Sequence, residues 1–460
     1  MKNFIKIDLY FLDFFVLFLL FNQISSNSYS DTLEIVAQFN ITRVKISENK
    51  IQDCEKCMPA GIKLSSNGTI FCSFPRWFEN VTTSFAKYNP KGQYFEPWPS
   101  LEMNQRYINF DPTGINSVLG FEIDLEDNIY ILDQGKVNNH EALDGSIKLL
   151  KFSLQTGALL KEYKFNCDMA NYTNSFLNDV VIDQKKEVAY IADSGLALDG
   201  KITHYQPGIL VLNLSSSEVH RILSNHYSVN PDETFWLHVD NQPVNRDSPM
   251  LTGADGIALS CDGETLYYCP LTGRMLYSVL TKDIEEAIKS GKTNDINVYQ
   301  GYKKEASDGL LASSKGNLYI SGIESGSVYI ANEIEPDLLR FNYKDFDGYV
   351  GNTSSMWPDT LAIYDGYLYF MSNQLNNFPN DINYTHPKNG KYNFAIMRFS
   401  VGNDESYLKG CTGFGNEWGV GTIIVWICFA VIVLIVLSFV LMGSNSQEDV
   451  IDKHMNMKED

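Results

Sequence analysis

The chain has 460 residues, more than an ordinary single domain but within the range of one large all-β unit. Aromatic residues make up 13% of the sequence and glycines number 32, which is typical of β-strands joined by many turns. The formal net charge is −20, so the surface repels phosphate backbones and we expect no nucleic-acid partner.

Residues 1–26 have the features of a secretory signal peptide. Lys2 and Lys6 precede an apolar run at residues 14–21, and a serine-rich stretch follows it. The alternative is a membrane anchor, but this run is too short to cross a bilayer. We therefore expect cleavage near residue 26 and a mature chain that faces the extracellular space or a lumen.

A second apolar stretch, residues 420–442, contains no charged residue and is long enough to cross a bilayer as one helix. A stalk at residues 401–419 precedes it, and a cytoplasmic tail at residues 443–460 follows it. The sequence predicts a single-pass membrane protein whose N-terminal domain is extracellular or lumenal. This orientation rests on the signal peptide.

The cysteines fit an oxidising compartment. Cys428 falls in the predicted span, and the other seven could form disulfides, with one thiol left free or joining two chains. Cys54 and Cys57 have a spacing that redox and zinc sites also use, but no second pair of cysteines or histidines completes a zinc site. We therefore expect structural disulfides. Seven glycosylation sequons begin at Asn40, Asn67, Asn80, Asn171, Asn213, Asn352 and Asn383.

One pattern recurs along residues 27–400. A short apolar alternation opens each copy, and a turn and a second, tyrosine-rich strand follow. The six copies open at Gly61, Val118, Asn178, Asp255, Asp308 and Asp359. The last four openings are separated by 77, 53 and 51 residues, and units of about 50 residues with several strands are typical of propeller blades. The sequence predicts an all-β, six-bladed β-propeller ectodomain with a C-terminal single transmembrane helix.

The fourth copy shows how one blade is built. Four strands are expected at residues 255–260, 265–269, 275–279 and 297–300. A helix at residues 282–290, ended by Gly291, interrupts them. The ring must also cover its last edge, and residues 33–39 alternate without another partner. We therefore expect residues 33–39 to form the outer strand of the last blade.

Several short motifs occur in a specific order over more than 300 residues. They include Met58-Pro-Ala-Gly-Ile62, Phe74-Pro-Arg-Trp77, Pro97-Trp-Pro-Ser100, Phe176-Leu-Asn-Asp-Val180, Tyr190-Ile-Ala-Asp-Ser-Gly195, Trp357-Pro-Asp-Thr-Leu361 and Met371-Ser-Asn-Gln374. In this order they resemble the major royal jelly and yellow protein family. The resemblance implies a six-bladed propeller, most often secreted. It also implies a central channel that binds amines or other small ligands in some members, and a link to catechol-derived quinones in others.

The residue that opens each inner strand should point toward the mouth of the central channel. This places four candidate ligand-binding residues together, namely Asn178, Asp255, Asp308 and Asp359. Carboxylates and an amide can bind an organic cation, or hold Ca2+ with Asn178 and Asp255 as the first ligands. The alternative is structural, because an Asp in an Asp-Gly turn often caps its own backbone. Lactonase propellers, which are similar in plan, add a glutamate from the first blade, and this chain has no acid at the corresponding point.

Other polar residues favour structural roles. Arg76 and Trp77 could stack against a ligand, but a blade-packing role is the stronger interpretation. No nucleophile elbow, phosphate loop or His-Glu-x-x-His motif occurs in the sequence. Four histidines lack metal-site spacing, namely His204, His220, His226 and His238.

Two hypotheses for the function remain. The first is a membrane-tethered propeller that binds a small ligand, such as a cationic or aromatic amine, or a surface protein. The second is an enzyme of the yellow or lactonase type, either a quinone-tautomerase-like isomerase or a calcium-dependent lactonase. Fold alone does not decide between them, because propellers host both classes.

Overall fold

The computed structural model describes residues 33–109, 111–138, 140–196, 206–239, 241–244, 247–332, 339–342, 357–377 and 392–412. The predicted signal peptide, membrane span and tail lie outside these residues, as do His204, Asn352 and Asn383. Within the described part, no helix is long and apolar enough to cross a membrane.

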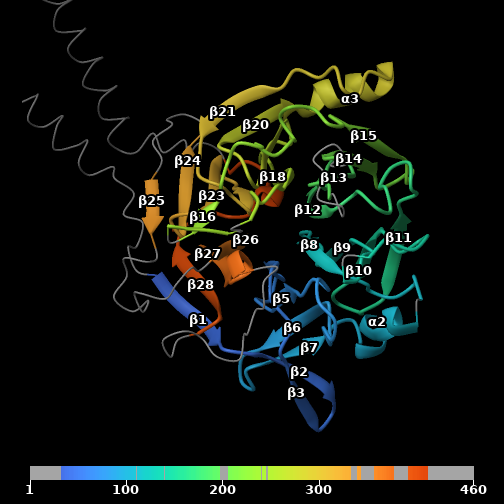
Figure 1. Ribbon diagram of the computed structural model, residues 1–460, viewed down its shortest axis with the longest axis vertical. Coiled ribbons are helices and arrows are strands. Elements are labelled where there is room, and N and C mark those ends of the chain that lie inside the picture. Colours follow the sequence, from blue (N-terminus) through green and yellow to red (C-terminus); the bar gives the residue numbers. More distant parts are fainter. Residues whose placement is uncertain are drawn as a thin grey trace, which may run out of the picture. The chain divides into compact units, whose positions relative to one another are not determined.

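Six mainly antiparallel sheets form the blades of a β-propeller, which confirms the all-β, six-bladed part of the predicted fold (Figure 1). Blade 1 contains β4 (Ile62–Leu64), β5 (Ile70–Ser73), β6 (Phe85–Asn89) and β7 (Tyr94–Pro97), extended by β2 (Thr42–Ser47) and β3 (Lys50–Cys54). Blade 2 contains β8 (Val118–Ile123), β9 (Asn128–Asp133), β10 (Lys148–Ser153) and β11 (Leu159–Lys164). Blade 3 contains β12 (Leu177–Asp183), β13 (Val188–Asp193), β14 (Gly208–Asn213) and β15 (Val219–Ile222).

The other three blades follow the same plan. Blade 4 contains β18 (Ala254–Leu259), β19 (Thr265–Pro270), β20 (Met275–Leu280) and β21 (Tyr299–Lys303). Blade 5 contains β22 (Leu310–Ala312), β23 (Asn317–Gly322), β24 (Ser327–Asn332) and β25 (Leu339–Asn342). Blade 6 contains β26 (Trp357–Tyr364), β27 (Tyr367–Asn373), β28 (Phe394–Ser400) and β1 (Leu33–Phe39).

The ring closes as the sequence predicts. β1 pairs antiparallel with β28, so the first described strand becomes the outer strand of the last blade. The inner strands touch one another in ring order, and β26 of the last blade contacts β4 of the first. This pairing covers the outward edge of β28, which would otherwise be open.

The burial of the strands decreases from the axis of the ring outward. The inner strands β8, β12 and β18 are buried along their whole length, because each is flanked by two neighbouring blades. The outer strand β11 is mostly exposed. The clusters of buried apolar residues lie between successive blades, as between blades 3 and 4, where Val181 and Tyr190 share a cluster with Ile257.

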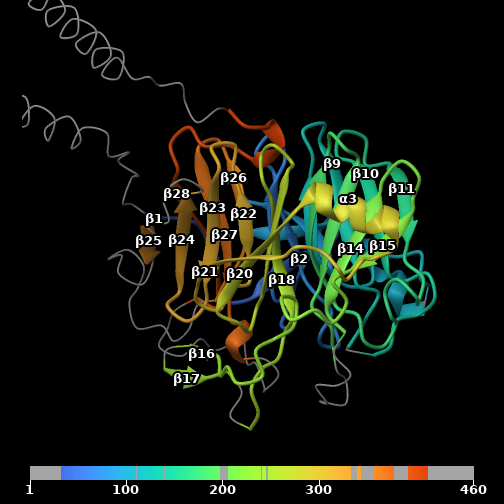
Figure 2. The same cartoon turned by 90° about the horizontal axis from the view of Figure 1, so that it is seen from above.

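Short elements decorate the blades. The helix α3 (Thr281–Ser290) follows β20 and ends at Gly291, which has a left-handed φ of 72°, as predicted. The helix α2 (Leu101–Gln105) begins at the cap Ser100 and continues into the 3-10 helix η1 (Arg106–Asn109). The hairpin of β16 (His238–Val239) and β17 (Gln242–Pro243) and the 3-10 helix η4 (Leu375–Asn377) lie at one face of the ring (Figure 2).

The chain after β28 crosses the opposite face, where its red end lies in Figure 2. Its 3-10 helix η5 (Tyr407–Lys409) buries Tyr407, whose hydroxyl bonds the backbone N–H and C=O of Ile182 at 3.0 and 3.1 Å. A disulfide joins Cys411 to Cys261 of blade 4. Residues 401–412, the described part of the expected stalk, therefore pack on the propeller.

The other cysteines agree with structural pairing. Cys54 and Cys57 form a disulfide, which excludes a zinc site there. Three described cysteines are free thiols, of which Cys72 and Cys269 are buried and Cys167 is exposed. The sequence predicts one cysteine that does not pair within the chain, and the described residues contain three.

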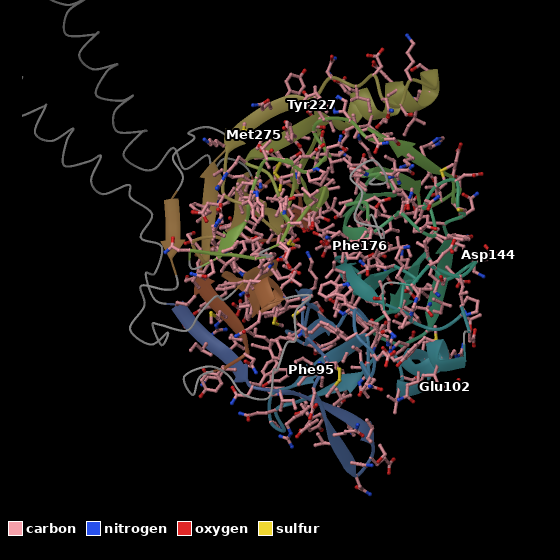
Figure 3. The ribbon with its side chains drawn as sticks, in the orientation of Figure 1. Phe95, Glu102, Asp144, Phe176, Tyr227 and Met275 are labelled. Carbon is pink, nitrogen blue, oxygen red and sulfur yellow. A yellow bond between two sulfur atoms is a disulfide. The ribbon has the colours of Figure 1, made fainter. Side chains whose placement is uncertain are left out.

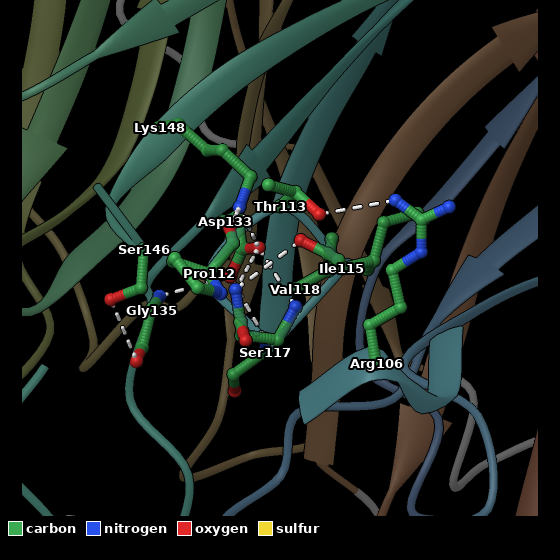
Figure 4. A network of polar contacts seen from close by, with 12 residues as sticks. Arg106, Pro112, Thr113, Ile115, Ser117, Val118, Asp133, Gly135, Ser146 and Lys148 are labelled. Atoms are coloured by element: carbon green, nitrogen blue, oxygen red, sulfur yellow. Dashed lines mark hydrogen bonds and ion pairs between the residues drawn. The ribbon is translucent and has the colours of Figure 1, made fainter. Parts of the chain in front are cut away.

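A buried ion pair holds blade 2 to its neighbouring loop (Figure 4). Lys148 Nζ lies 3.4 Å from Asp133 Oδ2, and both side chains are fully buried. The same carboxylate accepts hydrogen bonds from the backbone N–H groups of Asn116, Ser117 and Gly135. The loops at the end of β9 are fixed by this single acid, and they stand next to the channel face described below.

Candidate functional site

The four predicted site residues do lie together at one end of the inner strands. Asn178, Asp255 and Asp359 each fall at a shift in the register between the inner strand and its neighbour. Asp308 lies two residues before the start of β22. Such bulges turn a side chain out of the regular pleat, so four blades present a polar group to one mouth of the channel.

Hydrogen bonds join these side chains across blade boundaries. Asn178 Nδ2 donates to Asp255 Oδ2 at 2.5 Å, and burial and the neighbouring Asp308 raise the pKa of Asp255. Trp357 Nε1 donates to Asp308 Oδ2, and Asn373 Nδ2 donates to Asp359 Oδ2 at 2.8 Å.

Burial controls the charge of this group. Asp255, Asp308 and Asp359 are 1%, 7% and 3% exposed. Burial raises the pKa of Asp308 to about 6, although its bonds to Trp357 and Asp255 lower it. Burial and the neighbouring carboxylates raise the pKa of Asp255 and Asp359 well above the usual value. The three acids therefore cannot all ionise at neutral pH without a compensating cation.

One acid oxygen is left for a ligand. Asp255 Oδ1 is buried and has no hydrogen-bond partner among the described residues. Buried carboxylate oxygens are normally bonded, so an orphan oxygen at a cavity indicates a missing partner.

A cavity of about 140 Å³ opens above these acids. Its polar floor contains Asn178, Asp255, Asp308 and Asp359, and its apolar wall contains Trp77, Leu119, Phe176, Met250, Leu251, Leu271 and Leu375. Figure 3 shows Phe176 toward the middle of the ring. The mouth therefore has a polar side and an apolar side. Leu119 of blade 2 occupies the position at which blades 3–6 carry polar side chains. This arrangement suits a molecule with one charged end and one apolar end.

The glycines that follow Asp255 and Asp308 allow a close approach between strands and do not form a turn. A Cβ on Gly256 would lie 2.6 Å from the carbonyl oxygen of Asp308, and one on Gly309 would lie 2.4 Å from that of Asp359. Neither glycine has a positive φ. Asp255-Gly and Asp308-Gly are therefore not the self-capping turns of the structural alternative.

The sequence predicts Ca2+ at the mouth, with Asn178 and Asp255 as its first ligands. In the structure Asn178 donates its amide N–H to Asp255 Oδ2, so this carboxylate oxygen already has a protein partner. No group of three or more His, Cys, Asp or Glu side chains in the described chain is placed to hold a metal ion. The residues present do not fit the Ca2+ expectation, and we derive no step through a metal.

Arg76 has the packing role that the sequence favours. Its buried guanidinium donates to the carbonyl oxygens of Val81 and Ile115, at 3.2 and 2.9 Å, and lies over the ring of Tyr107. Burial lowers the pKa of Arg76 to about 10. Its neighbour Trp77 is different, because it lines the mouth cavity.

The sequence did not identify most residues of the apolar cavity wall, nor the side chains that donate hydrogen bonds to the acids. Trp357 and Asn373 stand in recognised motifs, but only the packing of blade 6 against blade 5 brings Trp357 to Asp308. His226 bonds Ser228 at 2.8 Å and His238 bonds the carbonyl oxygen of Trp236 at 2.8 Å, so neither joins the mouth.

Comparison with known proteins places the chain in a family. The sequence model of the family described as "Major royal jelly protein" matches residues 116–406. Major royal jelly protein 7 of Apis mellifera is 25% identical over 348 residues, which cover 71% of this chain and 72% of that protein. Dopaminechrome tautomerase of Drosophila melanogaster is 21% identical over 364 residues, covering 75% and 74%.

Other similarities are shorter or more remote. Major royal jelly protein 3 of Apis mellifera is 27% identical over 260 residues, so the match covers 55% of this chain and only 44% of that protein. Several other royal jelly proteins are matched over about half of their length. A luciferin-regenerating enzyme aligns with a TM-score of 0.46 and 12% identity over 82% of this chain and 97% of that one. Because the family match covers more than half of the sequence, the chain belongs to the major royal jelly protein family.

Proposed function

We propose that the chain is a membrane-tethered propeller that binds a small aromatic amine at the mouth formed by Asn178, Asp255, Asp308 and Asp359. The observation that carries this proposal is the buried Asp255 Oδ1, which has no partner among the described residues and belongs to a cluster of three acids. An ammonium group would bond this oxygen and compensate the charge. The ring of the ligand would lie against Trp77, Leu119 and Phe176.

Calorimetric titration of the full chain with tyramine tests this proposal. Tyramine carries one ammonium and one aromatic ring, and 3-(4-hydroxyphenyl)propionate is its anionic counterpart. We expect tyramine to bind, the anion not to bind, and Asp255→Asn to weaken tyramine binding by about tenfold or more. Asp295→Asn, at an exposed site in the same blade region, should leave affinity unchanged. Equal binding of the amine and the anion would exclude the acids as the recognition element.

A second candidate function is catalytic. Dopaminechrome tautomerase, a relative over three quarters of both chains, is named for a reaction that moves a proton within its substrate. A buried carboxyl whose pKa is raised toward neutrality, such as Asp308 at about 6, could donate and accept that proton. Conversion of dopaminechrome by the purified chain, abolished by Asp308→Asn and retained by Asp295→Asn, would favour this function over binding alone.

Membrane tethering is the other part of the proposal. It rests on the sequence of residues 420–442, which has no charged residue over a bilayer-spanning length. Alkaline carbonate extraction of membranes should leave the full chain in the pellet. A chain truncated after residue 412 should be secreted. Release of the full chain by carbonate would contradict the tether without affecting the ligand proposal.

A further inference from the structure

A second and much smaller cavity lies below the acids of the mouth, deeper along the channel. Its volume is about 10 Å³, close to the space that one water molecule needs. The polar groups that line it are Asn178, Asp179, Asp255, Asp308, Asp359 and Thr360. A water held there would have the two to four polar partners that a buried water requires.

Asp179 is the new member of this set, and the proposed ligand site does not use it. It is 8% exposed, and its Oδ1 accepts a hydrogen bond from the backbone N–H of Val180 at 2.8 Å. Its carboxylate packs against Gly120 of blade 2, where an added Cβ would lie 3.0 Å from Oδ1. Asp179 therefore points into the channel between the mouth and its far end.

Charged groups face Asp179 from every side. Those that interact with it are Lys63 of β4, Glu122 of β8, Asp308 before β22, Asp359 of β26 and Tyr407 of η5. Lys63 Nζ pairs with Glu122 Oε2 at 3.1 Å, and both side chains are over nine-tenths buried. This pair also lines a cavity of about 390 Å³ beneath the segment that carries η5.

We propose that one water molecule occupies the small cavity, bonds Asp255 Oδ1 and the carboxylate of Asp179, and lets these two acids exchange a proton. In the transfer, the O–H bond of protonated Asp255 breaks and its proton passes to the water. The water gives one of its own protons to Asp179, which becomes a neutral carboxylic acid. No other reactant is needed, and the water is regenerated.

The charges around Asp179 make it a suitable acceptor. Burial raises the pKa of Asp179 to about 7, while Lys63 lowers it, so this acid can hold a proton close to neutral pH. A cation that binds at the mouth favours ionised Asp255, and the displaced proton then has a place inside the protein. This inference goes beyond the proposed function, because the water and the exchange belong to the free protein: the water bonds Asp255 Oδ1 there, and a bound ammonium group would take over that bond.

A double-mutant cycle in the unliganded full chain tests the coupling. The readout is the infrared band of protonated carboxyl groups, followed between about pH 4 and about pH 9. Asp179→Asn should remove part of this band and shift the midpoint of the remaining loss downward by about one pH unit, because Asp308 and Asp359 no longer face its charge. In an Asp255→Asn background, which removes the partner acid of the exchange, the shift caused by Asp179→Asn should be smaller.

The matched control is Asp183→Asn. Asp183 is buried on the same strand β12, but it does not line the small cavity. We expect this variant to leave the midpoint of the mouth acids unchanged. Additive effects of Asp179→Asn and Asp255→Asn would overturn the coupling, and so would a high-resolution crystal structure with no water between Asp179 and Asp255. Neither outcome depends on whether tyramine binds.

Discussion

Trp357 of blade 6 donates its indole N–H to Oδ2 of Asp308 at the edge of blade 5. A donor of this kind stabilises the ionised form of a buried acid. It explains why the pKa of Asp308 stays at about 6 while the pKa of Asp255 and of Asp359 rises well above the usual value. Asp308 is therefore the first of the three acids to ionise as the pH rises.

Trp357→Phe should move the pH dependence of ligand binding. The substitution removes the indole donor but keeps a large aromatic ring, so the pKa of Asp308 should rise by about one unit. Tyramine affinity should then reach its plateau about one pH unit higher, because the acid group ionises later. Calorimetric titration across a pH series measures this shift.

Trp98→Phe is the control for that substitution. Trp98 packs edge-on against Phe71 in blade 1 and does not line the mouth. Its removal should lower stability without moving the pH profile of binding. An unchanged profile in Trp357→Phe would mean that the indole does not set the ionisation of Asp308.

Asp255→Asn should stabilise the free protein at neutral pH while it weakens binding. Because the folded-state pKa of Asp255 is raised, the fold favours the protonated acid. Its contribution is most favourable below the unfolded pKa of about 4 and is lost as the pH rises through the folded value. The gain in unfolding free energy should therefore be present near pH 7 and absent near about pH 4. Urea unfolding at the two pH values measures it.

Asp133→Asn serves as the reference, because we expect it to lower the free energy of unfolding. Asp133→Asn would leave Lys148 buried without its ion pair. Breaking a buried pair from one side costs about 3–5 kcal/mol. If Asp255→Asn and Asp133→Asn destabilise the protein equally, the burial and mutual repulsion of the mouth acids do not lower its stability at neutral pH.

Gly309→Ala should lower the free energy of unfolding by about 1–3 kcal/mol, because a Cβ there overpacks the contact with the next blade. The added atom would lie 2.4 Å from the carbonyl oxygen of Asp359, so the inner strands of blades 5 and 6 would have to separate. Gly273→Ala is the control, since its nearest neighbour would be Pro270 at 3.4 Å. Thermal unfolding of both variants measures the difference, and equal melting temperatures would rule out a close approach at Gly309.

Removal of the Cys261–Cys411 disulfide should destabilise the propeller more than removal of the Cys54–Cys57 disulfide. The first joins residues 150 apart and the second joins residues 3 apart. By the loop-entropy argument, Cys411→Ser should cost about 2–5 kcal/mol. Denaturant unfolding of Cys411→Ser and Cys57→Ser compares them. A larger loss in Cys57→Ser would show that residues 401–412 add little to the fold.

The sequence was sufficient for the plan of the ring, and particular residues show why. Alternation at residues 265–269 and 275–279 is typical of half-buried strands, and β19 and β20 appear close to their expected places. The closing strand β1 could be predicted because its alternation had no other partner. Convergence of Asn178 with Asp255 followed from their equal position in the repeat.

The remainder depends on contacts between blades, which leave no periodic signal. Trp357 reaches Asp308 only after blade 6 packs against blade 5. The role of Asp179 was hidden because a bulge changes the alternation at Leu177–Val180 and turns this acid toward the axis. The hydroxyl of Tyr407 bonds the backbone of Ile182, which lies 225 residues earlier in the chain. The segment around Tyr407 is too short to show a periodic pattern of apolar residues, so the sequence does not predict this contact.

The narrow space between the mouth acids and Asp179 has a consequence for exchange. It has room for about one water, so a ligand of the size of an amine would not pass through it. A ligand of the size of an amine must leave by the rim through which it came. A ligand would then enter and leave through the same opening. A second molecule bound at the rim by Trp77 or Phe176 would slow both the binding and the release of the first.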